Sequence, residues 1–260
     1  MCTSDLQNYK ICQGVSFFAP QFCGTQKEAL RYIVDHHLAP SVLARSAFCG
    51  RAIENAVKTG CEQVVLYACG YDTFSMRNQH KGLKIYELDR PEMIRDKQRR
   101  VNQIGSRLLS QVEYIACDLS LPSWKEMLIR RGFDSEKPFF GSLLGSSYYL
   151  EKDAFKNLIG TISVLASEGT SICFDYPMED DGEVSLRTRA LAAAAGEKMK
   201  AKYGFGEIQT LLEDAGFSIV EQMDADEMTR AFFEAYNLAN EDHAMAAPKG
   251  VGYCLAEKRP

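Results

Sequence analysis

The sequence predicts an α/β protein with a doubly wound, mostly parallel sheet of seven strands, a helical N-terminal cap and an inserted lid. Three observations predict it. Short apolar segments alternate with amphipathic segments of helical period from Gln63 to Tyr176. Pro177–Gly206 breaks this rhythm with an acidic turn and an alanine-rich segment. Two more strand-like segments, joined by one helical segment, follow near the C-terminus. Strands separated by helices pair in parallel and carry helices on both faces.

The segment before the sheet is predicted to be helical. Apolar residues recur at three- and four-residue spacing from Lys27 to Lys58, with a break at Pro40. Gly60 follows as the expected C-cap, because glycine readily adopts the left-handed conformation that ends many helices. These helices form the cap.

The sheet and its helices follow from the same periods. In the first half we expect five strands, in QVVLYAC, LKIYELD, VEYIACD, PFFGSLLGSSYYL and TSICFDY. Helices PEMIRDKQRRVNQIG, SWKEMLIRRG and EKDAFKNLIGTISVLAS lie between them, after the second, third and fourth strands. The lid contains a helix from about Ser185 to Lys202. Helix EIQTLLEDAG, strand FSIVEQM, helix DEMTRAFFEAYNL and strand GYCLAEK come after it. The last two strands are expected to form an antiparallel pair at the end of the sheet.

Composition narrows the function. Hydrophobic residues make up 46% of the chain and charged residues 25%, with a formal net charge of −5, as in ordinary soluble proteins. Nucleic-acid binding needs clustered cations, so we expect no nucleic-acid partner. The basic run Arg95, Lys97, Arg99 and Arg100 is interpreted as the solvated face of a helix.

The compartment is predicted to be the cytoplasm. Nine cysteines occur without a CxxC pair or clustered histidines, so we expect free thiols, a reducing environment and no metal site. The N-terminal residues carry no apolar signal segment, and the apolar runs are too short to cross a bilayer. We therefore expect no membrane partner.

The turn after the first strand, in VVLYACGYDTFSMR, is the first candidate site. Ligands of doubly wound sheets bind at the carboxyl ends of the strands. A dinucleotide site would use three glycines to crowd a pyrophosphate, whereas this turn has only Gly70. Asp72 would repel a phosphate but tolerate a positive group such as a sulfonium. The turn therefore favours S-adenosylmethionine over NAD.

Two more strands end in acids. Asp89 follows Gly70 by nineteen residues, close to the ~20 typical of an acid that binds ribose hydroxyls. Glu87 lies on the same face of its strand, and Asp118 follows the third strand. Each acid alone could equally cap a helix, but the series predicts a ligand site along one edge.

Four blocks in this order resemble the leucine carboxyl methyltransferase family, which includes bacterial O-methyltransferases acting on small molecules. The blocks are LARSAFCGRAIENAVKTGCEQVVLYACGYDTFSMR, IYELDRPEMIRDKQ, YIACDL and EKMKAKYGFGEIQTLLEDAGF. The resemblance implies a class I methyltransferase with a Rossmann-like fold and S-adenosylmethionine as cofactor. From the order of the segments we expect one domain over 1–260, with the cap in 1–62, a cofactor-binding half in 63–176, the lid in 177–206 and a C-terminal half in 207–260.

The resemblance also implies roles for individual residues. Arg45, which alone would be interpreted as a surface arginine, matches the family arginine that pairs with the cofactor's methionine carboxylate. Ala68 and Gly70 match the cofactor turn, and Asp89 matches the ribose ligand. Asp118 matches the ligand of the adenine amine, and the backbone of Leu119 a contact to the ring.

The sequence departs from the family pattern at two cofactor positions. The family usually has glycine at position 68, where this chain has alanine. A family glutamate aligns with Leu144, so we expect weaker cofactor binding or a substitute among Ser142, Ser146 and Ser147. The first forty residues match poorly, and in this family they help to build the substrate pocket.

We expect O-methylation of a small-molecule hydroxyl or carboxylate. The alternatives are methylation of a protein C-terminal carboxylate and cofactor binding without catalysis. A carboxylate needs no base, whereas a hydroxyl does. No base is identified: His36 and His37 close a helix, and Tyr149 and Tyr176 could face the pocket but receive no role.

Overall fold

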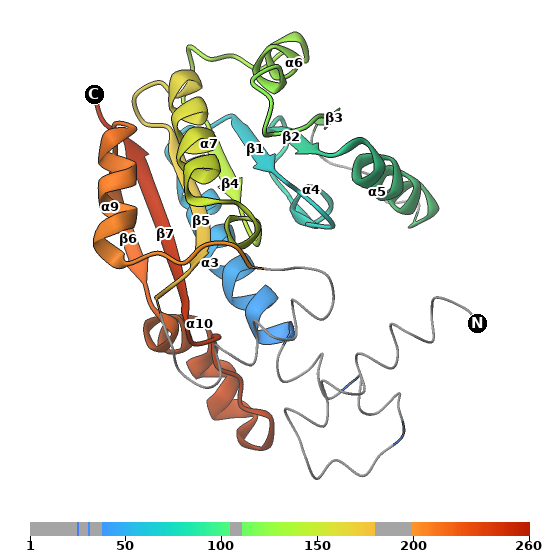
Figure 1. Cartoon of the computed structure of the whole chain (residues 1–260). Helices are drawn as coiled ribbons and strands as arrows, with labels where there is room; N and C mark the ends of the chain where they lie inside the picture. Colours follow the sequence, from blue (N-terminus) through green and yellow to red (C-terminus); the bar gives the residue numbers. More distant parts are fainter. Residues whose placement is uncertain (1–24, 26–30, 32–37, 105–110, 180–198) are drawn as a thin grey trace, which may run out of the picture.

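The computed structural model describes residues 25, 31, 38–104, 111–179 and 199–260. Figure 1 shows a central twisted sheet with helices on both sides. The described elements are α3 (Ala39–Lys58), β1 (Gln63–Tyr67), α4 (Phe74–Arg77), β2 (Lys84–Asp89), α5 (Pro91–Ile104), β3 (Gln111–Ala116), α6 (Trp124–Arg130), β4 (Phe140–Leu143), η2 (Ser147–Tyr149), α7 (Lys152–Leu165), β5 (Ser171–Pro177), α9 (Phe205–Asp214), β6 (Phe217–Met223), α10 (Ala225–Ala239), η3 (Glu241–His243) and β7 (Val251–Lys258).

The sheet has seven strands in the order β3-β2-β1-β4-β5-β7-β6. Strands β1 to β5 pair in parallel. Strand β7 lies between β5 and β6 and runs antiparallel to both. The predicted α/β class, the doubly wound sheet and the antiparallel terminal pair are confirmed. Chain order reverses between β1 and β4, so ligands are expected outside the carboxyl ends of these strands.

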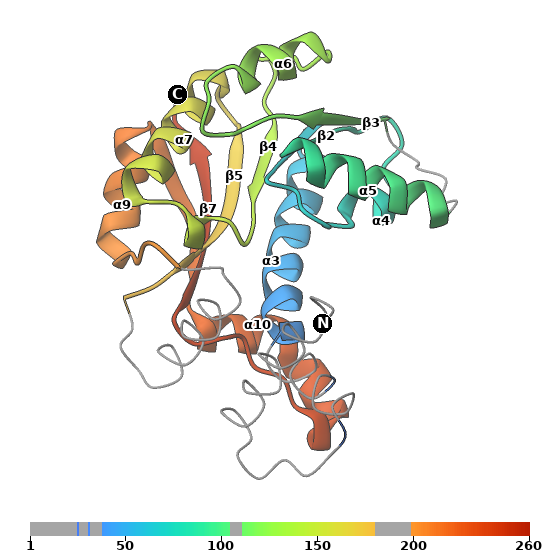
Figure 2. The same ribbon diagram turned by 45° about the vertical axis from the view of Figure 1, so that its right-hand side comes forward.

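Alternation along β1 divides the core into two layers. Val65 and Tyr67 belong to the cluster under α6, α7 and α9, and Val64 and Leu66 to the cluster under α3, α5 and α10. Figures 1 and 2 show α7 and α9 on one side of the sheet, and α3 with α10 on the other. Because successive strand residues face opposite sides, a purely apolar run such as QVVLY fits a strand covered on both faces.

Helix α3 differs slightly from its prediction. The helix begins at Ala39, so Pro40 lies in its first turn rather than in a break. Proline is tolerated there because the first helical N–H groups have no partner within the helix. Gly60 follows the helix with a φ of 101°, in the left-handed conformation expected of it.

The predicted cap and lid lie largely outside the described residues. Of the cap before α3, only residues 25, 31 and 38 are described, and 180–198 of the lid are not. The two described ends of the lid segment are held together, because Tyr203 N–H donates to Pro177 O at 2.9 Å. The N–H of Lys200 donates to the O of Tyr148, in η2, at 2.8 Å. The predicted division of the domain stays a prediction.

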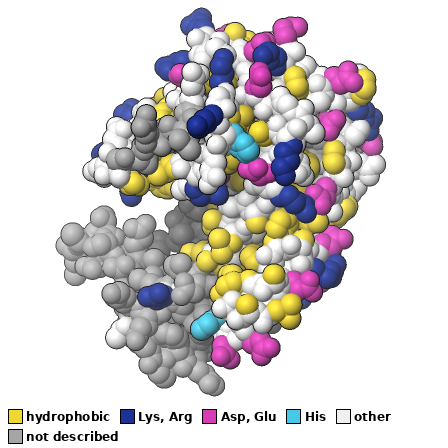
Figure 3. Space-filling view, turned by 180° about the vertical axis from the view of Figure 1, so that it is seen from behind, with side chains coloured by type: hydrophobic (Ala, Val, Ile, Leu, Met, Phe, Trp, Pro, Cys, Tyr) yellow, Lys and Arg dark blue, Asp and Glu magenta, His cyan; other side chains and the backbone are white. Residues whose placement is uncertain are grey.

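The outer surface mixes both signs of charge. On the face shown in Figure 3, acidic and basic side chains of the described residues are interspersed, with apolar side chains between them. No helix among the described residues is long and apolar enough to cross a membrane. Within the same residues, no group of three or more His, Cys, Asp or Glu side chains is arranged to hold a metal ion.

Candidate active site

The turn after β1 has two residues with positive φ, one on each side of Cys69. Ala68 has a φ of 50° and Gly70 a φ of 46°, both in the left-handed region. The N–H of Cys69 donates to Leu88 O at 3.0 Å, and Asp72 N–H donates to Cys69 O at 2.8 Å, which closes the turn. A left-handed alanine costs roughly 1–2 kcal/mol relative to a right-handed one. The family glycine at position 68 thus corresponds to a backbone requirement, which this chain meets with an alanine under strain.

Asp89 holds this turn from the end of β2. Its Oδ2 accepts a hydrogen bond from Gly70 N–H at 2.7 Å, and its Oδ1 accepts one from Arg90 N–H at 2.7 Å. The residue is only half-buried. Each carboxylate oxygen has a second lone pair, so the group can fix the turn and still accept hydrogen bonds from a diol.

Asp118 lies at the same edge, beyond β3. Asp89 is in register with Ala116, so the edge of the sheet brings the two acids near each other. Asp118 Oδ1 accepts hydrogen bonds from Ser120 N–H at 2.9 Å and from Ser120 Oγ at 2.7 Å. These bonds lower the pKa of this exposed carboxyl group. Leu119 packs against the core beside it.

The third acid of the series has a local role. Asp72 Oδ1 accepts a hydrogen bond from Phe74 N–H at 2.6 Å, at the start of α4. For Asp72 the helix-start interpretation therefore describes what the side chain does, and the carboxylate at the cofactor edge comes from Asp89 and Asp118.

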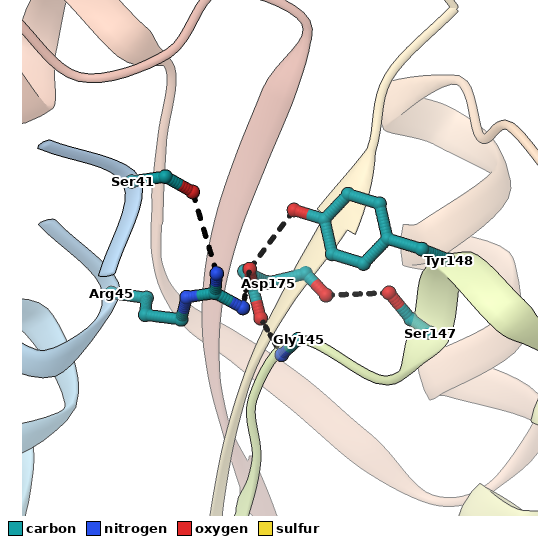
Figure 4. A network of polar contacts seen from close by, with 6 residues as sticks. All are labelled: Ser41, Arg45, Gly145, Ser147, Tyr148 and Asp175. Carbon is teal, nitrogen blue, oxygen red and sulfur yellow. Dashed lines mark hydrogen bonds and ion pairs between the residues drawn. The ribbon is translucent and has the colours of Figure 1, made fainter. Parts of the chain in front are cut away.

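Arg45 joins a network that the sequence did not reveal (Figure 4). Its Nη1 lies 3.6 Å from Asp175 Oδ2, and its Nη2 donates to Ser41 Oγ at 3.4 Å. Asp175 Oδ1 accepts from Gly145 N–H at 2.6 Å, and its Oδ2 accepts from Tyr148 OH at 2.9 Å. Arg45 Nε is buried and has no hydrogen-bond partner. The network links α3, β5 and the segment after β4.

Gly145 makes the close approach possible. It has a φ of 68°, and a Cβ on this residue would lie 2.1 Å from Arg45 Nη1. The backbone conformation favours glycine at position 145, and a larger residue there would have to displace the guanidinium of Arg45.

The network shifts its ionisable groups in a consistent way. Burial disfavours the charged form of Arg45, but the carboxylate of Asp175 outweighs it together with smaller contributions, so the pKa of Arg45 is raised. Burial, and then the charge of Asp175, raises the pKa of Tyr148 well above its usual value. The same two causes raise the pKa of Tyr253, whose buried hydroxyl has no hydrogen-bond partner. The two phenols are therefore neutral at physiological pH.

The end of β4 carries no acid of its own. Leu144 is half-buried in the position of the family glutamate. Of the serines considered as substitutes, Ser142 accepts from Cys49 Sγ at 3.4 Å, and Ser147 donates to Asp175 O at 2.6 Å. The Oγ of Ser146 is buried without a hydrogen-bond partner.

The structure corrects two interpretations of side chains. In the basic run, Arg95, Arg99 and Arg100 are exposed as expected, but Lys97 is buried, and its Nζ lies 2.7 Å from Glu87 Oε2, with exposed fractions of 3% and 0%. Tyr176 does not face a pocket, because it is fully buried and its OH accepts from Gln222 Nε2 at 2.5 Å. Tyr149 is half-buried in η2.

A small hollow with a cavity volume of about 10 Å³, room for about one water molecule, lies between α3, the β1 turn and the end of β4. It is lined by Ser46, Cys49, Gly50, Ile53, Leu66, Asp72, Phe74, Arg77, Ser142 and Leu144. The hollow borders the turn, and its lining includes the Leu144 position.

The residues present fit an S-adenosylmethionine-type ligand. The unpartnered Arg45 Nε is a buried donor suited to a carboxylate. The half-buried Asp89 can accept from ribose hydroxyls, and the exposed Asp118 can accept from an exocyclic amine. Because β3, β2, β1, β4 and β5 are neighbours and parallel, Asp89 after β2 and Asp118 after β3 lie at one edge of the sheet. Arg45 of α3 lies beside Asp175 of β5.

The model of the family described as "Leucine carboxyl methyltransferase" matches residues 14–163. This chain belongs to that family. The match confirms the predicted family and, with it, an S-adenosylmethionine-dependent methyltransferase. It spans α3, the β1 turn, β2, β3 and β4, the elements that supply the candidate site.

Relatives agree with this assignment. YktD of Bacillus subtilis, whose name is that of an S-adenosyl-L-methionine-dependent methyltransferase, is 28% identical over 260 residues, 95% of this chain and 83% of its own length. A Mycobacterium marinum protein named in the same way is 32% identical over 159 residues, 58% of this chain and 50% of its own length.

Solved structures show the same fold. A DUF574 family protein from Streptomyces avermitilis matches with a TM-score of 0.66 and 14% identity, over 95% of this chain and 96% of its own. Magnesium protoporphyrin IX methyltransferase from Synechocystis PCC 6803, solved with bound SAH, matches with a TM-score of 0.56 and 12% identity. The match covers 97% of this chain and 95% of that one. At such identities the likeness establishes the Rossmann-like fold of class I methyltransferases.

Proposed function

We propose that this methyltransferase transfers a methyl group from S-adenosylmethionine to an oxygen atom of a small molecule, a carboxylate or a hydroxyl. The observation that carries the proposal is the edge of the sheet where Arg45, Asp89 and Asp118 lie on successive strand ends and α3. These groups are complementary to the amino-acid end, the sugar and the base of the cofactor. The family description, which names a carboxyl methyl acceptor, supports oxygen as the acceptor.

Each site residue has a proposed role in binding. Arg45 binds the methionine carboxylate, and Asp89 accepts hydrogen bonds from the ribose. Asp118 accepts from the adenine amine, and the backbone of Leu119 contacts the ring. Ala68 and Gly70 shape the turn on which the cofactor lies. When bound, the cofactor supplies a methyl group activated by its sulfonium.

Orientation is the first requirement of the reaction, and the two buried tyrosines of the network supply no base. Methyl transfer is an in-line displacement, and the acceptor atom must be held about 3 Å from the carbon it attacks. Tyr148 and Tyr253 have raised pKa values because they are buried beside Asp175, so neither is a base at neutral pH. A carboxylate is already a nucleophile, and the described site can serve it without proton transfer.

Calorimetry followed by a turnover screen tests the proposal. We expect S-adenosylmethionine and its demethylated product to bind, and expect methyl transfer to small carboxylic acids or phenols. A peptide ending in leucine is the matched comparison, because its terminal carboxylate represents the protein substrate. Transfer to the peptide alone would contradict the small-molecule acceptor. Binding without transfer to any acceptor class would favour the non-catalytic alternative, and absence of binding at millimolar cofactor would refute the site.

A further inference from the structure

Asp175 is a buried acid whose place in the fold calls for an explanation. It lies in β5 with 1% of its surface exposed. Burying a carboxylate costs several kcal/mol in proteins unless the charge is paired and hydrogen-bonded. Because side chains alternate along a strand, Asp175 shares the α3 face of the sheet with Cys173, one of the core residues under α3. An apolar residue would be the usual occupant of such a position.

The pairing with Arg45 is open on one side. Asp175 Oδ2 lies 3.6 Å from Nη1, which is longer than a bidentate contact, and 22% of the Arg45 side chain is exposed. The Nε donor of Arg45 is buried and has no hydrogen-bond partner. A guanidinium has five donors in a rigid plane, so Asp175 fixes this plane while leaving donors for a second anion.

Asp175 also contacts the segment after β4, where this chain has Leu144 in place of the family glutamate. The residue after Leu144 is Gly145, and its N–H donates to Asp175 Oδ1 at 2.6 Å. Ser147 Oγ donates to Asp175 O at 2.6 Å, and Tyr148 OH donates to Asp175 Oδ2 at 2.9 Å. A carboxylate of the neighbouring strand β5 is therefore bonded to the backbone N–H that follows the Leu144 position.

We propose that Asp175 is a positioning residue that holds Arg45 for the carboxylate at the amino-acid end of S-adenosylmethionine. This inference rests on the proposed function, since it assumes that the cofactor binds at this edge. Asp175 acts through Arg45 and need not touch the cofactor. The neutral ion pair lowers the cost of a half-buried guanidinium, and the fixed plane reduces the ordering cost of binding.

Two ligands separate positioning from general structure. S-adenosylhomocysteine carries the amino-acid end, whereas 5′-methylthioadenosine has the same nucleoside without any carboxylate. We expect Asp175→Asn to weaken S-adenosylhomocysteine binding roughly ten- to hundredfold, as loss of an outer-shell partner does at metal sites, and to leave 5′-methylthioadenosine binding unchanged. In an Arg45→Ala background, Asp175→Asn should add no further loss, because coupled residues are non-additive. Isothermal calorimetry measures the binding of each ligand to the unmodified protein, the two single variants and the double variant.

The outcomes distinguish this inference from the proposed function. Equal weakening of both ligands by Asp175→Asn, or weakening of neither, would overturn the positioning role. Failure of the unmodified protein to bind either ligand would instead refute the proposed function. Glu221→Gln is the matched control, because Glu221 pairs with Arg51, also on α3, at 2.6 Å and lies outside the site. Its binding of both ligands should be unchanged.

A second variant tests the same inference if Asp175→Asn fails to fold. Gly145→Ala keeps both charges, but its Cβ would occupy the position of Arg45 Nη1 and displace the guanidinium. We expect the same selective loss of S-adenosylhomocysteine binding. Circular dichroism and thermal unfolding establish that the variant is folded, and a folded Gly145→Ala protein with unchanged preference between the two ligands would count against the inference.

Discussion

Two buried ion pairs lie on the α3 face of this sheet, and their geometries differ. Glu87 and Lys97 meet at 2.7 Å with exposed fractions of 0% and 3%. Arg45 and Asp175 meet at 3.6 Å, and 22% of the arginine is exposed. The first pair links β2 to α5 and is closed because solvent does not reach it, although Lys97 Nζ and both Glu87 carboxylate oxygens make no hydrogen bond. The second is open because its arginine is partly exposed, and its carboxylate accepts hydrogen bonds from Gly145 N–H and Tyr148 OH. The comparison indicates that a closed pair serves the fold, whereas an open pair can receive a ligand.

Breaking the closed pair should have the largest effect. Lys97→Met leaves the Glu87 carboxylate buried without a partner, so we expect the free energy of unfolding to fall by about 3–5 kcal/mol. Urea denaturation measures this change. The double variant with Glu87→Gln should recover most of the loss, and the surface variant Lys137→Met, which breaks the exposed contact to Glu62, should have no measurable effect. A small loss in Lys97→Met would remove the distinction between the pairs.

Breaking the open pair should affect binding more than folding. Arg45→Ala is expected to reduce S-adenosylhomocysteine affinity by about 2 kcal/mol or more, since it removes one member of a partly buried charge pair. The bonds of Asp175 to Gly145 and Tyr148 remain, so the loss of stability should be smaller than in Lys97→Met. Calorimetry measures the loss of affinity, and urea denaturation of the same preparations compares the two losses of stability. A larger loss of stability in Arg45→Ala than in Lys97→Met would contradict the prediction.

Asp89 tests the other end of the cofactor site. Asp89→Asn removes the charge but keeps the shape, and hydrogen bonds to charged groups contribute about 1.5–3 kcal/mol. We therefore expect weaker binding of S-adenosylhomocysteine and of 5′-methylthioadenosine alike, since both contain the ribose. Selective loss of only one of them would show that Asp89 does not bind the sugar.

Substitution of Ala68 by glycine should increase stability, unlike the substitutions above. Glycine at this position relieves the left-handed strain but adds flexibility to the unfolded chain. The net expected result of Ala68→Gly is a gain of up to about 1 kcal/mol in unfolding free energy, with equal or tighter cofactor binding. Thermal unfolding measures it, and a clear loss of stability would mean that the strain at Ala68 is offset by its packing.

The smallest expected effect concerns pH. The bonds from Ser120 lower the folded-state pKa of Asp118, so their stabilisation is present above the unfolded-state pKa and is lost as pH falls through the folded-state value. Ser120→Ala removes the Oγ bond but keeps the backbone N–H bond, so it should raise the pKa of Asp118 only part of the way toward its ordinary value, as measured by NMR titration of the carboxyl group. An unchanged titration would exclude the Oγ bond as a contributor.

Much of this molecule could be predicted from sequence because its signals are local. Apolar runs and turns define the strands, and in a parallel sheet the residue after each strand lies at a common edge. Gly70, Asp89 and Asp118 could therefore be identified as candidates by counting. The roles of these residues remain predictions, since they depend on a ligand that sequence can only imply.

The ion pairs could not be predicted in the same way, because their partners are distant in the chain. Asp175 lies inside the apolar run SICFDY, which gave no reason to expect Arg45 beside it. Lys97 was assigned to the solvated face from charge alone. Helical spacing held the better signal, since Lys97 falls three residues after buried Ile94 and four before buried Val101.

The position of β7 has a consequence for biosynthesis. This strand is the last in the chain, yet it lies between β5 and β6. Until Lys258 has left the ribosome, β5 has an open edge and β6 has no neighbour in the sheet. Chains fold largely from the N-terminus during synthesis, and open edges invite pairing with other chains. The nascent protein therefore depends on β7, which follows β5 and β6 in the sequence, to cover the edge of β5 and to bring β6 into the sheet.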